Sequence, residues 1–441
     1  MSKKLIVIGG GLAGSEAAWQ AARRGIKVIL YEMRPDKLTE AHRTGMLAEL
    51  VCSNSLRSND VYSAPGLLKK ELSMAGSLIM EAANISTVPA GSALAVDRKL
   101  FSDFITVRLS GNPNIEIIRK ECTELPDTIT VIATGPLTSE TMAKSLSDLL
   151  GDNHLYFYDA IAPIIDAESL DYENVYRASR YGKGGDDYIN CPMTKNEYED
   201  FYNTLMEADR VTPREFEEGK VFEGCMPIEV MASRGVDTLR FGPMKPVGLA
   251  DPKSGKEPYA VVQLRAENKE MTAYNMVGFQ TRLKWPEQKR VFSMIRGLEH
   301  AEFLRFGSIH RNTFINSPLF LNKYLTLKIN GNVFIAGQIS GVEGYIESTA
   351  MGLIAGINAS LKLKGGSLTE VPSSTSHGAL IKHITESESK HFQPSNINFG
   401  LFPVSDEILR IKDKKQRRKM IVEKAIEDWE DYLLRVDERT Y

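Results

Sequence analysis

Three glycines near the N-terminus have the spacing of a dinucleotide-binding turn. They follow an apolar run at residues 5–8 and open an alanine-rich stretch at 15–24, and an acid ends the next apolar run at 27–31. In such a turn the first glycine makes the bend, the second admits a pyrophosphate, and the third packs helix on strand, while the acid binds ribose hydroxyls. The pattern predicts a nucleotide site formed by Gly9, Gly10, Gly11, Leu12, Ala13, Gly14 and Glu32. The alternative is a tight turn in another α/β protein.

A second glycine-rich turn lies in the C-terminal third of the chain. It runs from Gly337 and Gln338 to Gly344 and Tyr345, and a helix of small residues is expected at 348–360. Backbone N–H groups in such a turn can bind a flavin ring or a phosphate. The two turns together favour FAD over NAD, although a small-residue helix packed closely on a sheet would have the same composition. Because no second GxGxxG is present, we expect nicotinamide to reach the flavin only transiently.

Two of the four cysteines lie in segments that suit a reactive thiol. Cys52 stands in a polar stretch that includes Arg57, and Cys225 follows a glycine and precedes Pro227. A thiol beside a cation or a helix N-terminus is easily deprotonated and becomes a nucleophile. Cys191 is a weaker candidate and Cys122 is expected to be structural, since unpaired cysteines are usually buried. With no CxxC, the sequence predicts neither a disulfide framework nor a metal site.

The order of apolar runs predicts an α/β fold with a Rossmann-like FAD-binding domain and an inserted α+β domain. Further strands are expected at 128–132 and 332–335, each ending in a glycine turn, as in a parallel sheet that binds a ligand at its strand ends. Between them, short β-like runs such as 260–264 alternate with amphipathic helices such as 196–208. We expect the FAD-binding domain at 1–175 and 326–441 and the inserted domain at 176–325.

The C-terminal 40 residues are expected to form a basic helix with one apolar face. That face contains Ile408, Leu409, Ile411, Ile421, Ala425, Ile426, Trp429 and Leu433.

The net charge is small, but basic and acidic residues are unevenly distributed along the chain. The 441 residues carry a net charge of −3, yet residues 281–330 carry +6 and residues 401–420 carry +4, which leaves −13 for the rest. Such segregation suits a surface that follows an RNA backbone, although a solvated basic helix would look the same. The sequence contains no apolar run long enough to span a membrane and no signal-peptide core, so we expect a cytoplasmic protein.

Beyond these general features, the chain resembles one known family nearly from end to end. The similarity is carried by the first glycine turn at 7–18, by Tyr-Glu-Met-Arg-Pro at 31–35, and by both cysteine segments, 52–57 and 223–229. It continues in the segments 307–313 and 337–345. These blocks are similar to those of the folate- and FAD-dependent tRNA uracil-5-methyltransferases, the TrmFO family.

The resemblance implies a flavoenzyme that makes 5-methyluridine at position 54 in the tRNA T-loop. It implies 5,10-methylenetetrahydrofolate as the one-carbon donor and NADH or NADPH as the reductant of FAD. The family's nucleophile, which attacks uracil C6, corresponds to Cys225, and its partner cysteine corresponds to Cys52. That partner either assists removal of the C5 proton or supports the flavin.

Other substrate contacts are less specific. His310 and Arg311 suit folate or phosphate, or are simply solvated. Trp285 suits stacking on a base, although a core position is favoured for this tryptophan. Three alternatives remain: the same chemistry on ribosomal RNA, a longer related flavoprotein that modifies the tRNA wobble uridine, and an RNA-binding module with a structural flavin. The sequence does not predict the oligomeric state.

Overall fold

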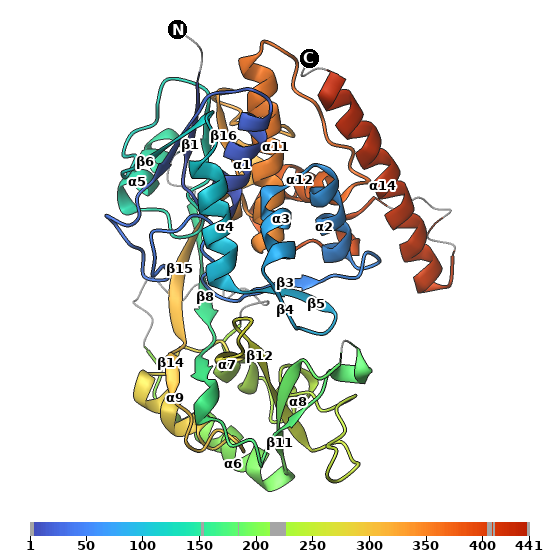
Figure 1. The fold of residues 1–441 in the computed structure, drawn as a ribbon. Coiled ribbons are helices and arrows are strands. Elements are labelled where there is room, and N and C mark those ends of the chain that lie inside the picture. Colours follow the sequence, from blue (N-terminus) through green and yellow to red (C-terminus); the bar gives the residue numbers. More distant parts are fainter. Residues whose placement is uncertain are drawn as a thin grey trace.

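The computed structural model describes residues 4–150, 154–183, 185–211, 226–403, 408 and 411–438. It has two lobes, with both ends of the chain in the larger one (Figure 1). Within the described residues, five parallel strands form the sheet of the larger lobe, in the order β16-β7-β1-β2-β6. The strands are β1 (Leu5–Ile8), β2 (Val28–Glu32), β6 (Ile115–Arg119), β7 (Thr130–Ile132) and β16 (Val333–Ile335). This sheet confirms the predicted α/β class.

In this lobe, a helix from the N-terminal part of the chain packs closely against a helix from the C-terminal part. Helix α1 (Leu12–Arg23) follows β1, and α11 (Tyr345–Leu363) lies against it (Figure 1). A Cβ atom on Gly352 would stand 2.1 Å from the Ala13 carbonyl oxygen, and one on Gly356 would stand 2.6 Å from that of Ala17. Small residues in α11 are therefore needed for contact with the helix α1, whereas the packing interpretation of this segment proposes close contact with the sheet.

The remaining elements of the larger lobe are helices and a separate small sheet. They are β3 (Ser55–Ser58), α2 (Ala64–Met74), α3 (Leu78–Ile85), β4 (Thr87–Val88), β5 (Ala93–Val96), α4 (Arg98–Ser110), α5 (Glu140–Leu150), α10 (Ser317–Phe320), α12 (Ser376–Glu386) and α14 (Lys414–Glu438). Strands β3, β5 and β4 form a small antiparallel sheet.

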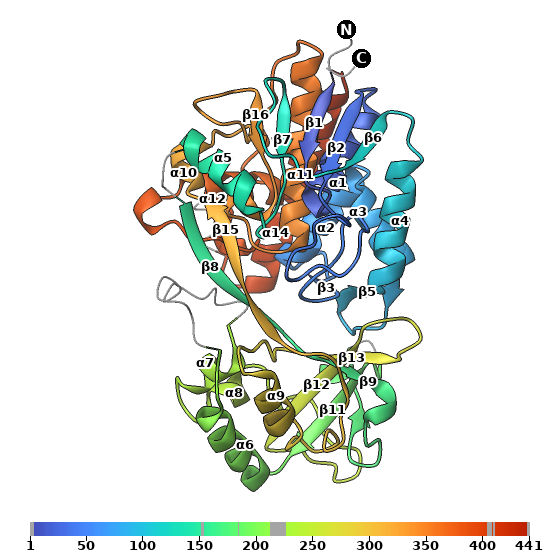
Figure 2. The same cartoon turned by 90° about the vertical axis from the view of Figure 1, so that its left-hand side faces the viewer.

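The second lobe is an insertion reached through a two-stranded antiparallel ribbon. Strands β8 (His154–Ile161) and β15 (Ser308–Ile315) form this ribbon and run between the lobes (Figure 2). In the described part of the second lobe, six strands pair in the order β10-β11-β12-β13-β9-β14, all antiparallel. The strands are β9 (Ile164–Asp166), β10 (Tyr176–Arg177), β11 (Tyr188–Met193), β12 (Ala260–Ala266), β13 (Ala273–Met276) and β14 (Phe303–Arg305).

Four helices of the second lobe complete its α+β architecture in the described residues. They are α6 (Lys195–Glu207), α7 (Ile228–Ala232), α8 (Thr238–Phe241) and α9 (Trp285–Phe292). The sheet of this lobe starts at β9 and ends at β14, and the paired strands β8 and β15 precede and follow it in the chain. We propose that the inserted domain extends from β9 to β14.

The C-terminal helix packs on the larger lobe through the part of the expected apolar face that begins at Ile421. Ile411, expected on the same helix, lies before α14, which begins at Lys414. Trp429 is fully buried, its indole N–H donates to the Glu71 carbonyl oxygen at 2.8 Å, and its ring stacks on His377 at 4.2 Å between centroids. Ile421 and Ala425 are buried on the same side. Within the described residues, none of the helices combines the length and apolarity needed to cross a membrane.

We expect Trp429→Ala to lower the free energy of unfolding by about 3–5 kcal/mol, because it removes a large buried side chain and a hydrogen bond. Leu434→Ala, on the same helix at a side chain that is 63% exposed, is the matched control and should change stability by less than about 0.5 kcal/mol. Urea unfolding followed by circular dichroism measures both. Equal effects of the two substitutions would contradict the packing described for α14.

Candidate active site

The first glycine turn has the geometry that a bound pyrophosphate requires. Gly9 has φ of +101°, and a Cβ atom there would stand 2.5 Å from the Ala133 carbonyl oxygen. A Cβ on Gly14 would stand 1.8 Å from the Gly9 carbonyl oxygen, so this glycine is needed for packing of α1 on the turn. Around Gly11, by contrast, no atom lies within 4 Å of a Cβ position. That open space faces the N-terminus of α1, where an anion is favoured, so the site fits a dinucleotide.

Glu32 lies at the position predicted to bind ribose hydroxyls, and its carboxylate already accepts several hydrogen bonds from the protein. Its Oε2 atom accepts the Gly10 N–H at 2.8 Å, and its two oxygens accept hydrogen bonds from the Arg34 guanidinium at 2.9 and 3.1 Å. Burial alone would raise the pKa of Glu32, but the hydrogen bonds and charge of Arg34 hold it below the ordinary value. The carboxylate is therefore ionised and held in place.

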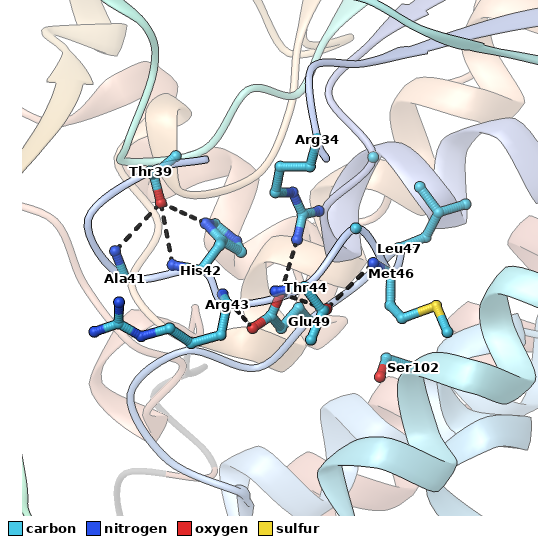
Figure 3. A network of polar contacts seen from close by, with 12 residues as sticks. Arg34, Thr39, Ala41, His42, Arg43, Thr44, Met46, Leu47, Glu49 and Ser102 are labelled. Atoms are coloured by element: carbon cyan, nitrogen blue, oxygen red, sulfur yellow. Dashed lines mark hydrogen bonds and ion pairs between the residues drawn. The ribbon is translucent and has the colours of Figure 1, made fainter. Parts of the chain in front are cut away.

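Arg34, which holds Glu32, also contacts Glu49 in a polar loop at residues 39–49 (Figure 3). Glu49 lines the cleft. Its Nη1 atom donates to Glu49 at 3.1 Å, and Glu49 accepts backbone N–H groups from Arg43 and Thr44. Sequence reasoning missed the roles of Arg34 and Glu49, although Arg34 stands inside one of the recognised segments.

One cleft collects the residues predicted to bind the cofactor. Its empty space, counted to the open mouth, is about 1010 Å³. The predicted residues on its wall are Gly9, Gly11, Leu12, Ala13, Glu32, Gly337, Gln338 and Tyr345. Gly10, Gly14 and Gly344 do not line it. Gly10 donates to Glu32, Gly14 packs on Gly9, and Gly344 has φ of +117° with Glu347 packed against it.

Cys52 lies beside this cleft and is hydrogen-bonded to Tyr345, which lines it. The Tyr345 hydroxyl lies 2.9 Å from the Cys52 Sγ atom and 2.9 Å from its backbone nitrogen. Tyr345 begins α11 and lines the cleft, so the thiol lies next to the cofactor region. Arg57, which sequence proximity suggested as the partner of Cys52, instead forms an ion pair with Glu347 at 3.0 Å.

The other cysteines differ in their surroundings. Cys191 is fully buried in β11, and burial raises the pKa of its thiol well above the ordinary value. Cys122 is half-buried on the cleft wall, and burial raises its pKa as well. Both thiols therefore stay protonated at neutral pH. Cys225 lies outside the described residues, which resume at Met226; soon after, the Ile228 N–H donates to the Gln280 carbonyl oxygen at 2.7 Å.

The predicted substrate residues lie in the second lobe and in the ribbon. His310 and Arg311 belong to β15, but their side chains lie outside what the structure describes. Trp285 begins α9, is 63% exposed and stacks on Phe306 with 5.6 Å between ring centroids. The core position considered for Trp285 is therefore wrong. Among the described residues, no cluster of His, Cys, Asp or Glu could hold a metal ion.

Comparison with known proteins gives consistent matches over the whole chain. A family profile described as Glucose inhibited division protein A matches residues 4–367. The methylenetetrahydrofolate–tRNA-(uracil-5-)-methyltransferase TrmFO of Moorella thermoacetica is 57% identical over 97% of this chain and 98% of its own length. The protein of the same name from Geobacter sulfurreducens is 56% identical over 99% of this chain and 100% of its own length.

A solved structure supports the fold. Aquifex aeolicus GidA, in its form II crystal, matches 99% of this chain with a TM-score of 0.69 and 17% sequence identity. This chain covers 76% of that GidA chain. At this identity the likeness supports the two-lobed α/β architecture and nothing more specific.

We expect Gly11→Val to abolish flavin binding without unfolding the protein. The backbone at Gly11 has φ of −72°, which any residue adopts, and the Cβ position is free of protein atoms, so a side chain there fills only the space predicted for pyrophosphate. Flavin absorbance of the purified variant should fall at least about tenfold, while far-ultraviolet circular dichroism stays unchanged. Full flavin content in this variant would contradict the assigned site.

Proposed function

Because this chain belongs to the methylenetetrahydrofolate–tRNA-(uracil-5-)-methyltransferase TrmFO family, within the proteins that match the Glucose inhibited division protein A profile, we propose that it methylates uridine at C5 in tRNA. The donor is 5,10-methylenetetrahydrofolate, and the cofactor is FAD. The observation that carries the proposal is identity of about 57% over nearly the full length of both chains. The finer assignment is uridine 54 of the T-loop, with NADH or NADPH as reductant.

FAD fits the cleft through groups that belong to this chain. The open space at Gly11 and the N-terminus of α1 would hold the pyrophosphate, Glu32 would bind the ribose, and the turn at Gly337 and Gln338 would hold the ring. When bound, the flavin supplies the redox and one-carbon chemistry that side chains lack.

The two cysteines divide the activation of uracil between them. The Cys225 thiolate adds to C6, so that a C–S bond forms and the electrons of the C5–C6 double bond move toward the C4 carbonyl oxygen, which makes C5 nucleophilic. Once C5 carries the new carbon, Cys52 takes up the C5 proton as the bond between that carbon and its carrier breaks. Two electrons that originate from NADPH or NADH then complete the methyl group, and the C6–S bond breaks, which restores the C5–C6 double bond and releases Cys225 as a thiolate. Support for the role of Cys52 comes from its place beside Tyr345 at the cleft.

Two surfaces suit the RNA. Trp285, exposed and stacked on Phe306, provides an aromatic face for a base. The basic start of α14 contains the exposed side chains of Lys414, Lys415, Arg418 and Lys419, which suit phosphate contacts. His310 and Arg311 stay candidates for folate or phosphate. A cytoplasmic location follows from a tRNA substrate.

The competing functions have less support. A wobble-uridine flavoprotein is less favoured because relatives that are 56–57% identical over nearly their full length are named as uracil-5-methyltransferases. A ribosomal RNA target involves the same chemistry and is separated only by assay. An RNA-binding module with a structural flavin has no use for a thiol beside the cleft.

We expect the purified yellow protein to form 5-methyluridine in a tRNA transcript when supplied with methylenetetrahydrofolate and NADPH or NADH. Product should vanish when folate is omitted, and S-adenosylmethionine should not replace it. A transcript with cytidine at T-loop position 54 and a ribosomal RNA transcript are the matched controls and should stay unmodified. Modification of the ribosomal transcript alone would contradict the tRNA assignment and identify ribosomal RNA as the substrate.

A covalent adduct tests the nucleophile separately. RNA that contains 5-fluorouridine should form a stable complex with the protein, visible as a shifted band on denaturing gels, because fluorine cannot leave C5 as a proton does. Cys225→Ala should abolish this band. Cys191→Ala, which changes a thiol buried in β11, is the control and should retain it. An adduct that survives Cys225→Ala would assign the attack on C6 to another residue.

A further inference from the structure

Three arginines from different parts of the fold converge on the loop that carries Cys52. Arg98 begins α4 and donates to the Leu50 carbonyl oxygen at 2.6 Å. Arg305 ends β14 and donates to the Val51 carbonyl oxygen at 2.7 Å. Arg265 lies in β12 and contacts the next residues, at 2.8 Å from the Ser53 hydroxyl and 2.9 Å from the Asn54 side-chain oxygen. The residues on both sides of Cys52 are thus held by guanidinium groups.

In the part of the chain that the structure describes, the arginines around this loop outnumber the carboxylates. Among the described residues, Glu267 is the one carboxylate that forms an ion pair with these arginines, through Arg98 at 2.5 Å. Arg265 and Glu267 are buried, and burial lowers the pKa of Arg265 and of Arg305. Buried cations without matching anions are unfavourable, so the site favours a further negative charge.

Tyr345 indicates which atom carries that charge. Its hydroxyl oxygen accepts two backbone N–H groups, from Cys52 at 2.9 Å and from Ser53 at 3.2 Å, which occupy its two acceptor positions. Burial, and then the nearby sulfur, raise the pKa of Tyr345 well above its ordinary value, so the phenol keeps its proton. The remaining partner within reach of that proton is the Cys52 Sγ atom at 2.9 Å, which therefore acts as an acceptor.

We propose that Arg98, Arg265 and Arg305, together with the Tyr345 hydroxyl, hold the Cys52 side chain as a thiolate. The proton leaves to solvent when the thiolate forms. The charged and titratable groups described around Cys52 are these four and Glu267. The role of the thiolate, removal of the uracil C5 proton, rests on the proposed function; its existence does not.

The same arrangement links Cys52 to the contact between the lobes. Arg265 and Arg305 belong to the sheet of the second lobe, whereas Cys52 and Arg98 belong to the larger lobe. The Asn54 amide also donates across this contact, to the Ala266 carbonyl oxygen at 2.9 Å. Two of the arginines that stabilise the thiolate therefore contact its loop across the lobe contact, and all three are positioning residues for Cys52.

The test is the pH dependence of Cys52 alkylation in the flavin-loaded protein. Iodoacetamide is added without folate or RNA, and peptide mass spectrometry follows each cysteine separately. We expect a midpoint for Cys52 well below the ordinary thiol value of about 8.5. Cys122 is the internal control and should react only at higher pH, because burial raises its pKa.

Removing a positive charge and removing a negative charge near Cys52 should shift its alkylation midpoint in opposite directions, whereas damage to the fold would not. Arg98→Gln should move the Cys52 midpoint upward and slow alkylation at pH 7 by about tenfold or more, whereas Glu267→Gln should move the midpoint downward. Lys99→Gln removes one charge at the adjacent residue, whose side chain is 84% exposed, and should leave the midpoint unchanged. If Arg98→Gln does not fold, the Glu267→Gln and Tyr345→Phe variants decide, the latter with an upward shift.

A midpoint for Cys52 at or above about 8.5 in the unsubstituted protein would overturn the proposal. The same conclusion would follow if Arg98→Gln and Glu267→Gln shifted the midpoint in one direction. Because alkylation requires no substrate, failure of methylation with a low Cys52 midpoint would count against the proposed function alone. Methylation with an ordinary midpoint would count against the thiolate alone.

Discussion

The close contact between α1 and α11 is the constraint on which the rest of the structure depends. Gly352 and Gly356 allow α11 to approach the backbone of Ala13 and Ala17 so closely that any side chain at either glycine would collide with it. This contact brings the second glycine turn, more than 300 residues away in the chain, beside the first. The cleft exists because both turns end at the same edge of the parallel sheet.

Tyr345 connects the packing of α11 to the reactive cysteine. It begins α11, lines the cleft with its ring, and reaches the Cys52 thiol with its hydroxyl. On the other side, the loop of Cys52 is held by arginines from the second lobe. Cofactor cleft, thiol and inserted domain therefore form one continuous set of contacts, in which a displaced lobe or helix would alter the reactive sulfur.

The sequence predicted those features that depend on local geometry. The first glycine turn was found because its glycines lie at fixed spacing between a strand and a helix, and Gly14 packs directly on Gly9. The buried face of α14 was found because Ile421, Ala425 and Trp429 recur with helical spacing. The family resemblance added the roles of the two cysteines, which neither composition nor spacing provides.

Features that depend on packing between distant segments were missed. Arg57 was paired with Cys52 because it is near in the chain, but its side chain turns to Glu347. Arg98, Arg265 and Arg305 carry no local signal, since they meet only where the two lobes touch. The exposure of Trp285 likewise depends on packing within the second lobe, where it begins α9 and stacks on Phe306.

The central claim is that the methyl carbon added to tRNA comes from folate through this site. It is tested most directly with methylenetetrahydrofolate that carries ¹³C and two deuterium atoms in its methylene group, followed by mass spectrometry of the tRNA nucleosides. The account predicts 5-methyluridine that contains the labelled carbon with both deuterium atoms. Unlabelled 5-methyluridine formed in the same reaction would contradict it.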